Sequence, residues 1–64
     1  MTQYDAALQH LLTVYNLLAP TGKEQTAMVA LVAEMQRERL TDKQIVRHVA
    51  GAIVDGVAYG NWPK

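Results

Sequence analysis

The chain has 64 residues, half of them hydrophobic, and its six basic and six acidic side chains cancel. This length allows one domain, spanning residues 1–64, and the zero formal charge provides no long-range attraction to nucleic acid or to an anionic membrane. Cysteine is absent, which excludes disulfides and thiolate metal sites and favours a reducing, cytoplasmic setting.

The first predicted helix covers residues 2–19. Its apolar residues step by four and three and therefore share one face. They are Tyr4, Leu8, Leu11, Tyr15 and Leu18. Thr2 is the predicted N-cap, Asp5 lies at the third position near the positive end of the helix dipole, and Pro20 ends the helix. Further apolar residues at 12, 14 and 17 predict that this helix contacts protein on two sides.

The second predicted helix covers residues 23–39. Thr21 and Glu24 have the spacing of a capping box, in which each side chain accepts a hydrogen bond from the other residue's backbone. Residues 27–33 form an apolar run that predicts burial nearly all round, whereas residues 34–39 are mostly charged and are expected to face water. This run is far shorter than the roughly 20 residues of a membrane-spanning helix.

The third predicted helix covers residues 42–59 and starts with a second capping box, Thr41 with Gln44. Gly60 suits the left-handed residue that ends a helix, and residues 60–64 form a C-terminal tail. The predicted core face consists of Val46, Val49, Ala50, Ile53 and Val57, flanked by Ile45 and Val54. Three helices with short corners, and no strand-like alternation, predict an all-α, compact three-helix bundle.

Small residues follow at intervals of four on the third helix: Ala52, Gly56 and Gly60. An interior glycine costs about 1 kcal/mol of helix propensity relative to alanine, so this stripe predicts close packing. Its expected occupant is the first or second helix of the same chain or the same stripe of a second copy, with a bound small molecule as the third alternative. Trp62 in the tail is expected to fold back over the core edge, and its alternative role is that of a partner anchor.

Candidate catalytic and metal-binding residues are few. His10 and His48 lack the spacing that puts two ligands on one helix face, so no metal or cofactor is predicted. Asp55 is the one acid in an apolar neighbourhood, and serine and cysteine nucleophiles are absent. The first residues also lack the basic start and apolar stretch of a secretion signal. We therefore expect a soluble, cytoplasmic protein that is not an enzyme.

The apolar positions exceed what three short helices can bury among themselves. This surplus predicts a small interaction or regulatory module that works through an apolar helical surface, as a homodimer or by docking on a larger protein. The predicted contact residues are Leu12, Val14, Leu17, Val29, Val32, Ala52, Val54, Gly56 and Trp62.

A second interpretation is a helix-turn-helix-like DNA-binding regulator that uses the basic corner between the second and third helices. Phosphate contacts there would come from cationic and polar side chains. They are Arg37, Arg39, Lys43, Gln44 and Arg47. Acidic residues at 34, 38 and 42 are interleaved with them, which favours an ordinary solvated surface of mixed charge.

Overall fold

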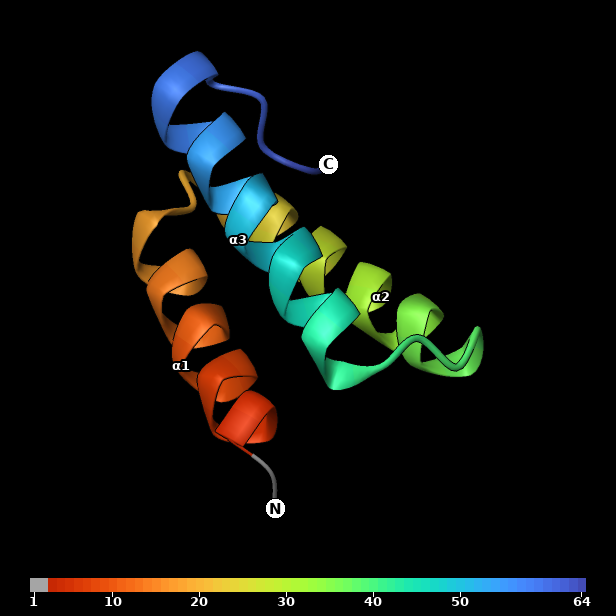
Figure 1. Cartoon of the computed structure of the whole chain (residues 1–64). Coiled ribbons are helices and arrows are strands. Elements are labelled where there is room, and N and C mark those ends of the chain that lie inside the picture. The colour runs from red at the N-terminus through yellow and green to blue at the C-terminus, as the bar shows by residue number, and fades with distance from the viewer. Residues whose placement is uncertain (1–2) are drawn as a thin grey trace.

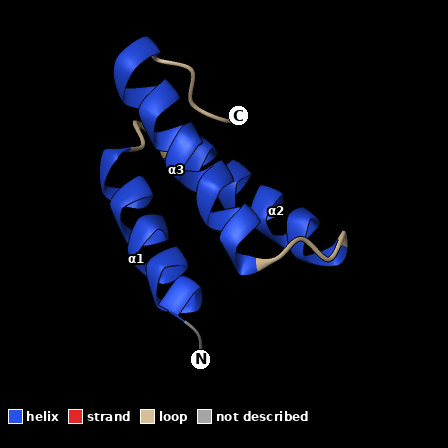
Figure 2. Cartoon of the chain, in the orientation of Figure 1, coloured by secondary structure: helices blue, strands red, loops and turns tan. Residues whose placement is uncertain are grey.

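Three helices make up the computed structural model, which describes residues 3–64. They are α1 (Gln3–Leu18), α2 (Gly22–Arg37) and α3 (Asp42–Tyr59), and no strand occurs among the described residues. Figures 1 and 2 show that α1 and α3 run in the same direction and that α2 runs in the opposite direction. The predicted all-α, compact three-helix architecture is confirmed, and α3 is the central element because it packs mainly against α1 and also contacts α2.

The two predicted capping boxes set the starts of α2 and α3. The backbone N–H of Thr21 donates to the Glu24 carboxylate at 3.0 Å, and the N–H of Thr41 donates to the side-chain oxygen of Gln44 at 2.9 Å. In return, each threonine hydroxyl accepts from a backbone N–H of the first helical turn. The predicted start of α3 at residue 42 is confirmed, while the predicted cap at Thr2 lies outside the described residues.

The ends of α2 and α3 each contain one residue in a left-handed conformation. Gly60 adopts a left-handed conformation with φ of 71°, and the N–H of Asn61 donates to the Asp55 carbonyl at 3.2 Å. At the end of α2, Arg39 adopts φ of 62° and the Leu40 N–H donates to the Met35 carbonyl at 3.1 Å. The predicted closing role of Gly60 is confirmed. The prediction that the second helix extends to residue 39 is wrong, because this left-handed turn ends α2 at Arg37.

One apolar cluster forms the core. Its buried members are Leu8, Tyr15, Met28, Val32, Met35, Ile45 and Val49. The predicted core face of α3 is therefore rotated: Ile45, expected at the flank, is fully buried, whereas Val57, expected in the core, is 63% exposed. Leu18 of α1, also expected in the core, is exposed as well. The inward face of α3 is the one that carries the small residues Ala52 and Gly56.

The apolar run of α2 is buried on one face only. Met28 and Val32 point into the core, but Val29 is 63% exposed and Leu31 is also exposed, so the expectation of burial all round is wrong. Met35 is buried although it lies in the polar half of the helix. The reason is geometric: α2 packs against α3 along one side, and residues four or three apart share that side. No described helix is long and apolar enough to cross a membrane.

Candidate protein-interaction surface

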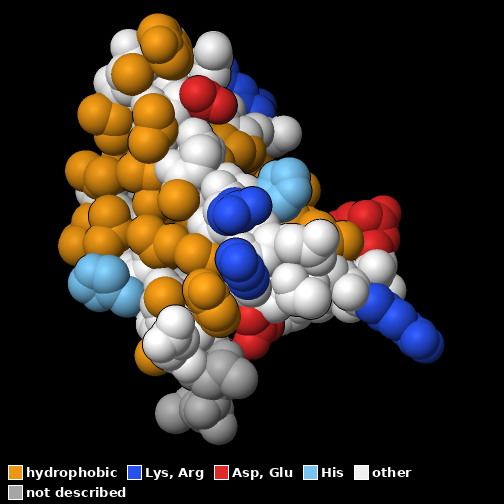
Figure 3. Space-filling model, in the orientation of Figure 1, with side chains coloured by type: hydrophobic (Ala, Val, Ile, Leu, Met, Phe, Trp, Pro, Cys, Tyr) orange, Lys and Arg blue, Asp and Glu red, His pale blue; other side chains and the backbone are white. Residues whose placement is uncertain are grey.

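A band of apolar side chains covers the outside of the bundle where α1 and α3 lie next to each other. We call it the seam surface. It is formed by Val14, Leu17, Leu18, Ala50, Val54 and Val57. Within each helix these residues are spaced by three and four, so they share one side. Figure 3 shows the hydrophobic side chains as a continuous area over the two helices on this side of the molecule.

The members of the seam surface are accessible to a partner. Leu17 is 81% exposed and Val54 is 61% exposed, while Val14 and Ala50 are half-buried at its inner edge. Single exposed apolar residues are common on protein surfaces, but a contiguous group usually marks an interaction site. Charged side chains lie along its border on α3, and Lys43, Arg47 and Asp55 are all exposed there.

On the inward face of α3, by contrast, the C-terminal tail covers the helix. A methyl group added at Gly56 would overlap the indole ring of Trp62, so the indole lies directly on the glycine. The rings of Trp62 and Tyr15 meet edge to face, with centroids 5.4 Å apart and an interplanar angle of 79°. The predicted fold-back of Trp62 over the core edge is therefore observed, and the return of the tail along the bundle is visible in Figure 2.

Beneath the tail, a buried polar group joins α1 to α2. The hydroxyl of Tyr15 donates to the backbone carbonyl of Glu24 at 3.0 Å. Burial, and then the nearby charge of Glu24, raise the pKa of the Tyr15 hydroxyl. The pKa of Glu24 is lowered, first by the hydrogen bond from the Thr21 hydroxyl and further by backbone N–H groups and the positive charge of Lys64. All these groups are engaged within the chain, which is typical of a structural role.

The predicted contact residues divide into three groups. Leu17, Val29 and Val54 are exposed, and Leu12, Val14, Ala52 and Trp62 are half-buried, as the burial pattern shows. Val32 and Gly56 are buried, the first in the core and the second under Trp62. These two lie inside the folded chain, where the core covers Val32 and the tail covers Gly56. Val29 is on α2, separate from the seam surface.

Three members of the seam surface were not among the predicted contacts: Leu18, Ala50 and Val57. The sequence assigned them to the core because they repeat at helical spacing beside the true inward residues. A second apolar stripe next to the first was the available signal, since Val46, Ala50, Ile53 and Val57 repeat with intervals of four, three and four. Two adjacent stripes on one helix indicate packing on two sides. In the second stripe Val46 and Ile53 pack against the core, whereas Val57 is exposed.

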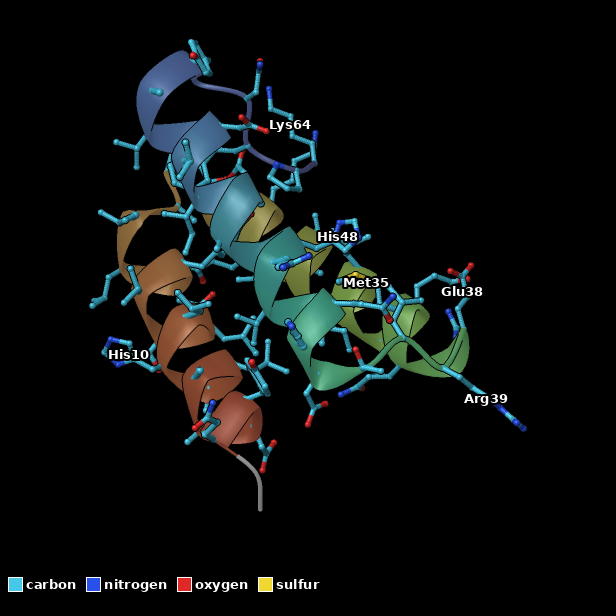
Figure 4. All side chains as sticks on the ribbon, in the orientation of Figure 1. His10, Met35, Glu38, Arg39, His48 and Lys64 are labelled. Atoms are coloured by element: carbon cyan, nitrogen blue, oxygen red, sulfur yellow. The ribbon has the colours of Figure 1, made fainter. Side chains whose placement is uncertain are left out.

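The basic corner does not form a converging cation cluster. Arg37 pairs with the Glu34 carboxylate one helical turn away. The side-chain oxygen of Gln44 caps α3. Arg39 projects away from the bundle at the far end of α2, as Figure 4 shows. Gln44, Arg47 and His48 line an open depression of about 320 Å³, whose walls are exposed side chains rather than an enclosed site.

Metal-binding and acid–base groups are equally dispersed. His10 lies on α1 and His48 on the opposite side of α3, well apart in Figure 4. Among residues 3–64, no group of three or more histidine, cysteine, aspartate or glutamate side chains is arranged to hold a metal ion. Asp55 is exposed near the end of α3.

Comparisons of the chain with protein-family models, with curated proteins and with solved structures give no match.

Proposed function

We propose that this chain is a small protein-interaction module that associates with a second copy of itself through the seam surface. The observation that carries the proposal is the continuous group of exposed aliphatic side chains on α1 and α3. Burying such side chains contributes about 25 cal/mol per Å² of apolar area removed from water. A small bundle of this size gains stability most readily from oligomerisation, because its own core is small and disulfides are absent.

A second copy suits this surface for two reasons. An interface of standard size takes about 800 Å² from each partner, which is roughly a fifth of the 4417 Å² surface of the chain and comparable to one face of two helices. The zero formal charge also means that two copies do not repel each other as a whole. In a two-fold dimer the same surface serves both partners, so one apolar face is sufficient.

Two matched variants test the proposal. Val57 in the seam surface and Val29 on α2 are both valines in helices and both 63% exposed. Val57→Glu places two charges in the proposed interface and should convert the dimer to a monomer, whereas Val29→Glu should leave the dimer intact. Light scattering after size exclusion measures the mass of each form at micromolar concentration. Equal masses for the two variants would contradict the assignment of the seam surface.

A further inference from the structure

Two opposite charges border the seam surface on α3. Arg47 lies one turn before Ala50 and two turns before Val54, so it shares their side of the helix. Asp55 lies on the neighbouring row, which it shares with Arg47 and Gly51 at intervals of four. Both charged residues are exposed. They are two turns apart, about 12 Å along the helix axis at 1.5 Å per residue. The two therefore lie too far apart to pair within one straight helix, and each offers its charge outward.

Gly51 lies midway between these charges. A methyl group added there would meet nothing within 4 Å, in contrast to Gly56, whose space is filled by Trp62. Glycine lowers helix propensity, and the described part of the chain makes no use of the space that Gly51 leaves. Its neighbour Ala50 is also small. A second helix could thus approach the backbone of α3 closely at this level.

From this arrangement we infer the geometry of the proposed dimer: two copies meet antiparallel across a two-fold axis at the level of Gly51, with α3 against the partner's α3. Residues equally far before and after the axis then face each other. Arg47 lies beside the partner's Asp55, and the symmetry repeats the same pair on the other side. Val54 lies between these two ion pairs, and Val57 lies just beyond them along α3. The inference rests on the proposed self-association and adds its direction and register.

The parallel alternative is less favourable electrostatically. It would set α3 against the partner's α1 and align the four helices of the interface in one direction, because α1 and α3 are parallel in each copy. The positive ends of the four helix dipoles would then lie together, and so would the negative ends, which is electrostatically unfavourable. The antiparallel arrangement places the N-terminal end of each α3, with Lys43 and Arg47, beside the C-terminal end of the partner's helices, where positive charge is favourable.

Charge reversal tests the pairing. Arg47→Glu and Asp55→Arg each replace two attractive pairs by two repulsive ones, so each variant alone should dimerise about tenfold more weakly than the original chain. An equimolar mixture should regain the original affinity, because a mixed dimer restores opposite charges on both sides. The double variant Arg47→Glu with Asp55→Arg should also regain it. Sedimentation equilibrium measures the dissociation constants, and circular dichroism confirms that each variant is folded.

Lys23→Glu is the matched control, because it changes the net charge as Arg47→Glu does but lies at the start of α2. It should leave the dissociation constant unchanged within about twofold. The antiparallel register would be overturned if the original chain dimerised and the single reversals did not weaken the dimer. It would also be overturned if the equimolar mixture kept the weaker dissociation constant. Neither result would contradict self-association itself. An original chain that stays monomeric throughout would instead overturn the proposed function.

Discussion

The two sides of α3 differ in how far the rest of the chain covers them. On the inward side, Gly56 is covered by Trp62, which also contacts Tyr15, so the tail completes the core. On the outward side, Val54 and Val57 remain largely exposed and Gly51 leaves open space. One helix therefore carries both a closed face, finished by its own tail, and an open face. Small and aliphatic residues at helical spacing therefore indicate that a helix face is packed, but they do not indicate which molecule packs against it.

The largest effect is expected from truncating the residue at the centre of the closed face. Tyr15→Ala removes a fully buried ring, its hydrogen bond to Glu24 and its contact with Trp62. It should lower the free energy of unfolding by about 3–5 kcal/mol, the usual range for large aromatic truncations. Tyr59→Ala, at a 74% exposed tyrosine of α3, should change it by less than about 0.5 kcal/mol. Urea denaturation followed by circular dichroism measures both, and similar losses would contradict the closed face described above.

A smaller effect should distinguish the two interior glycines. Gly51→Ala adds a methyl group in open space and should stabilise the helix by about 1 kcal/mol. Gly56→Ala gains the same propensity but displaces the indole of Trp62, so its net effect should be zero or destabilising. The free energy of unfolding of both glycine variants is best measured in the Val57→Glu background, where dimerisation does not contribute.

Trp62 is the only tryptophan, so its fluorescence reports on the tail directly. The emission should shift to longer wavelength in Gly56→Ala, as the indole moves toward water, and should stay unchanged in Gly51→Ala. An unchanged spectrum together with a stability gain in Gly56→Ala would show that the indole does not lie on the glycine.

The smallest effect concerns how the stability of the folded chain depends on pH through the carboxylate of Glu24. Because the folded state lowers the pKa of Glu24 below its ordinary value of 4.5, the ionised carboxylate contributes stability above that pH, and this contribution is lost as the pH falls through the folded-state pKa. Thermal unfolding of the original chain and of Glu24→Gln should therefore differ near neutral pH and converge in acid. Thr21→Ala should remove most of the same dependence, since its hydroxyl is the main cause. A difference between the two proteins that stays as large in strong acid as at neutral pH would contradict this assignment.

Local signals in the sequence predicted much of the fold. The capping boxes at Thr21 and Thr41 and the glycine at position 60 act through neighbours within a few residues, so they fixed the starts of α2 and α3 and the end of α3. The end of α2 could not be predicted, because Arg39 is not a residue type that marks a left-handed position.

The rotation of α3 could not be read from the sequence, because two apolar stripes lie side by side on that helix. The inward stripe includes Gly56, which is covered by Trp62 only because the tail turns at Gly60. For the same reason, Val57 was placed in the core and Gly56 on a contact surface. Leu18 was placed in the core because α1 also carries apolar residues on more than one side. The existence of an apolar surplus was predictable from composition, whereas its position required the tertiary contacts.

The most direct test of the central claim, that the open face makes the chain associate with itself, is the mass of the unmodified protein in solution across a dilution series. Sedimentation equilibrium should give twice the 7.1 kDa chain mass at micromolar concentration and should approach the single-chain mass on dilution. A mass of 7.1 kDa at every concentration would contradict the claim.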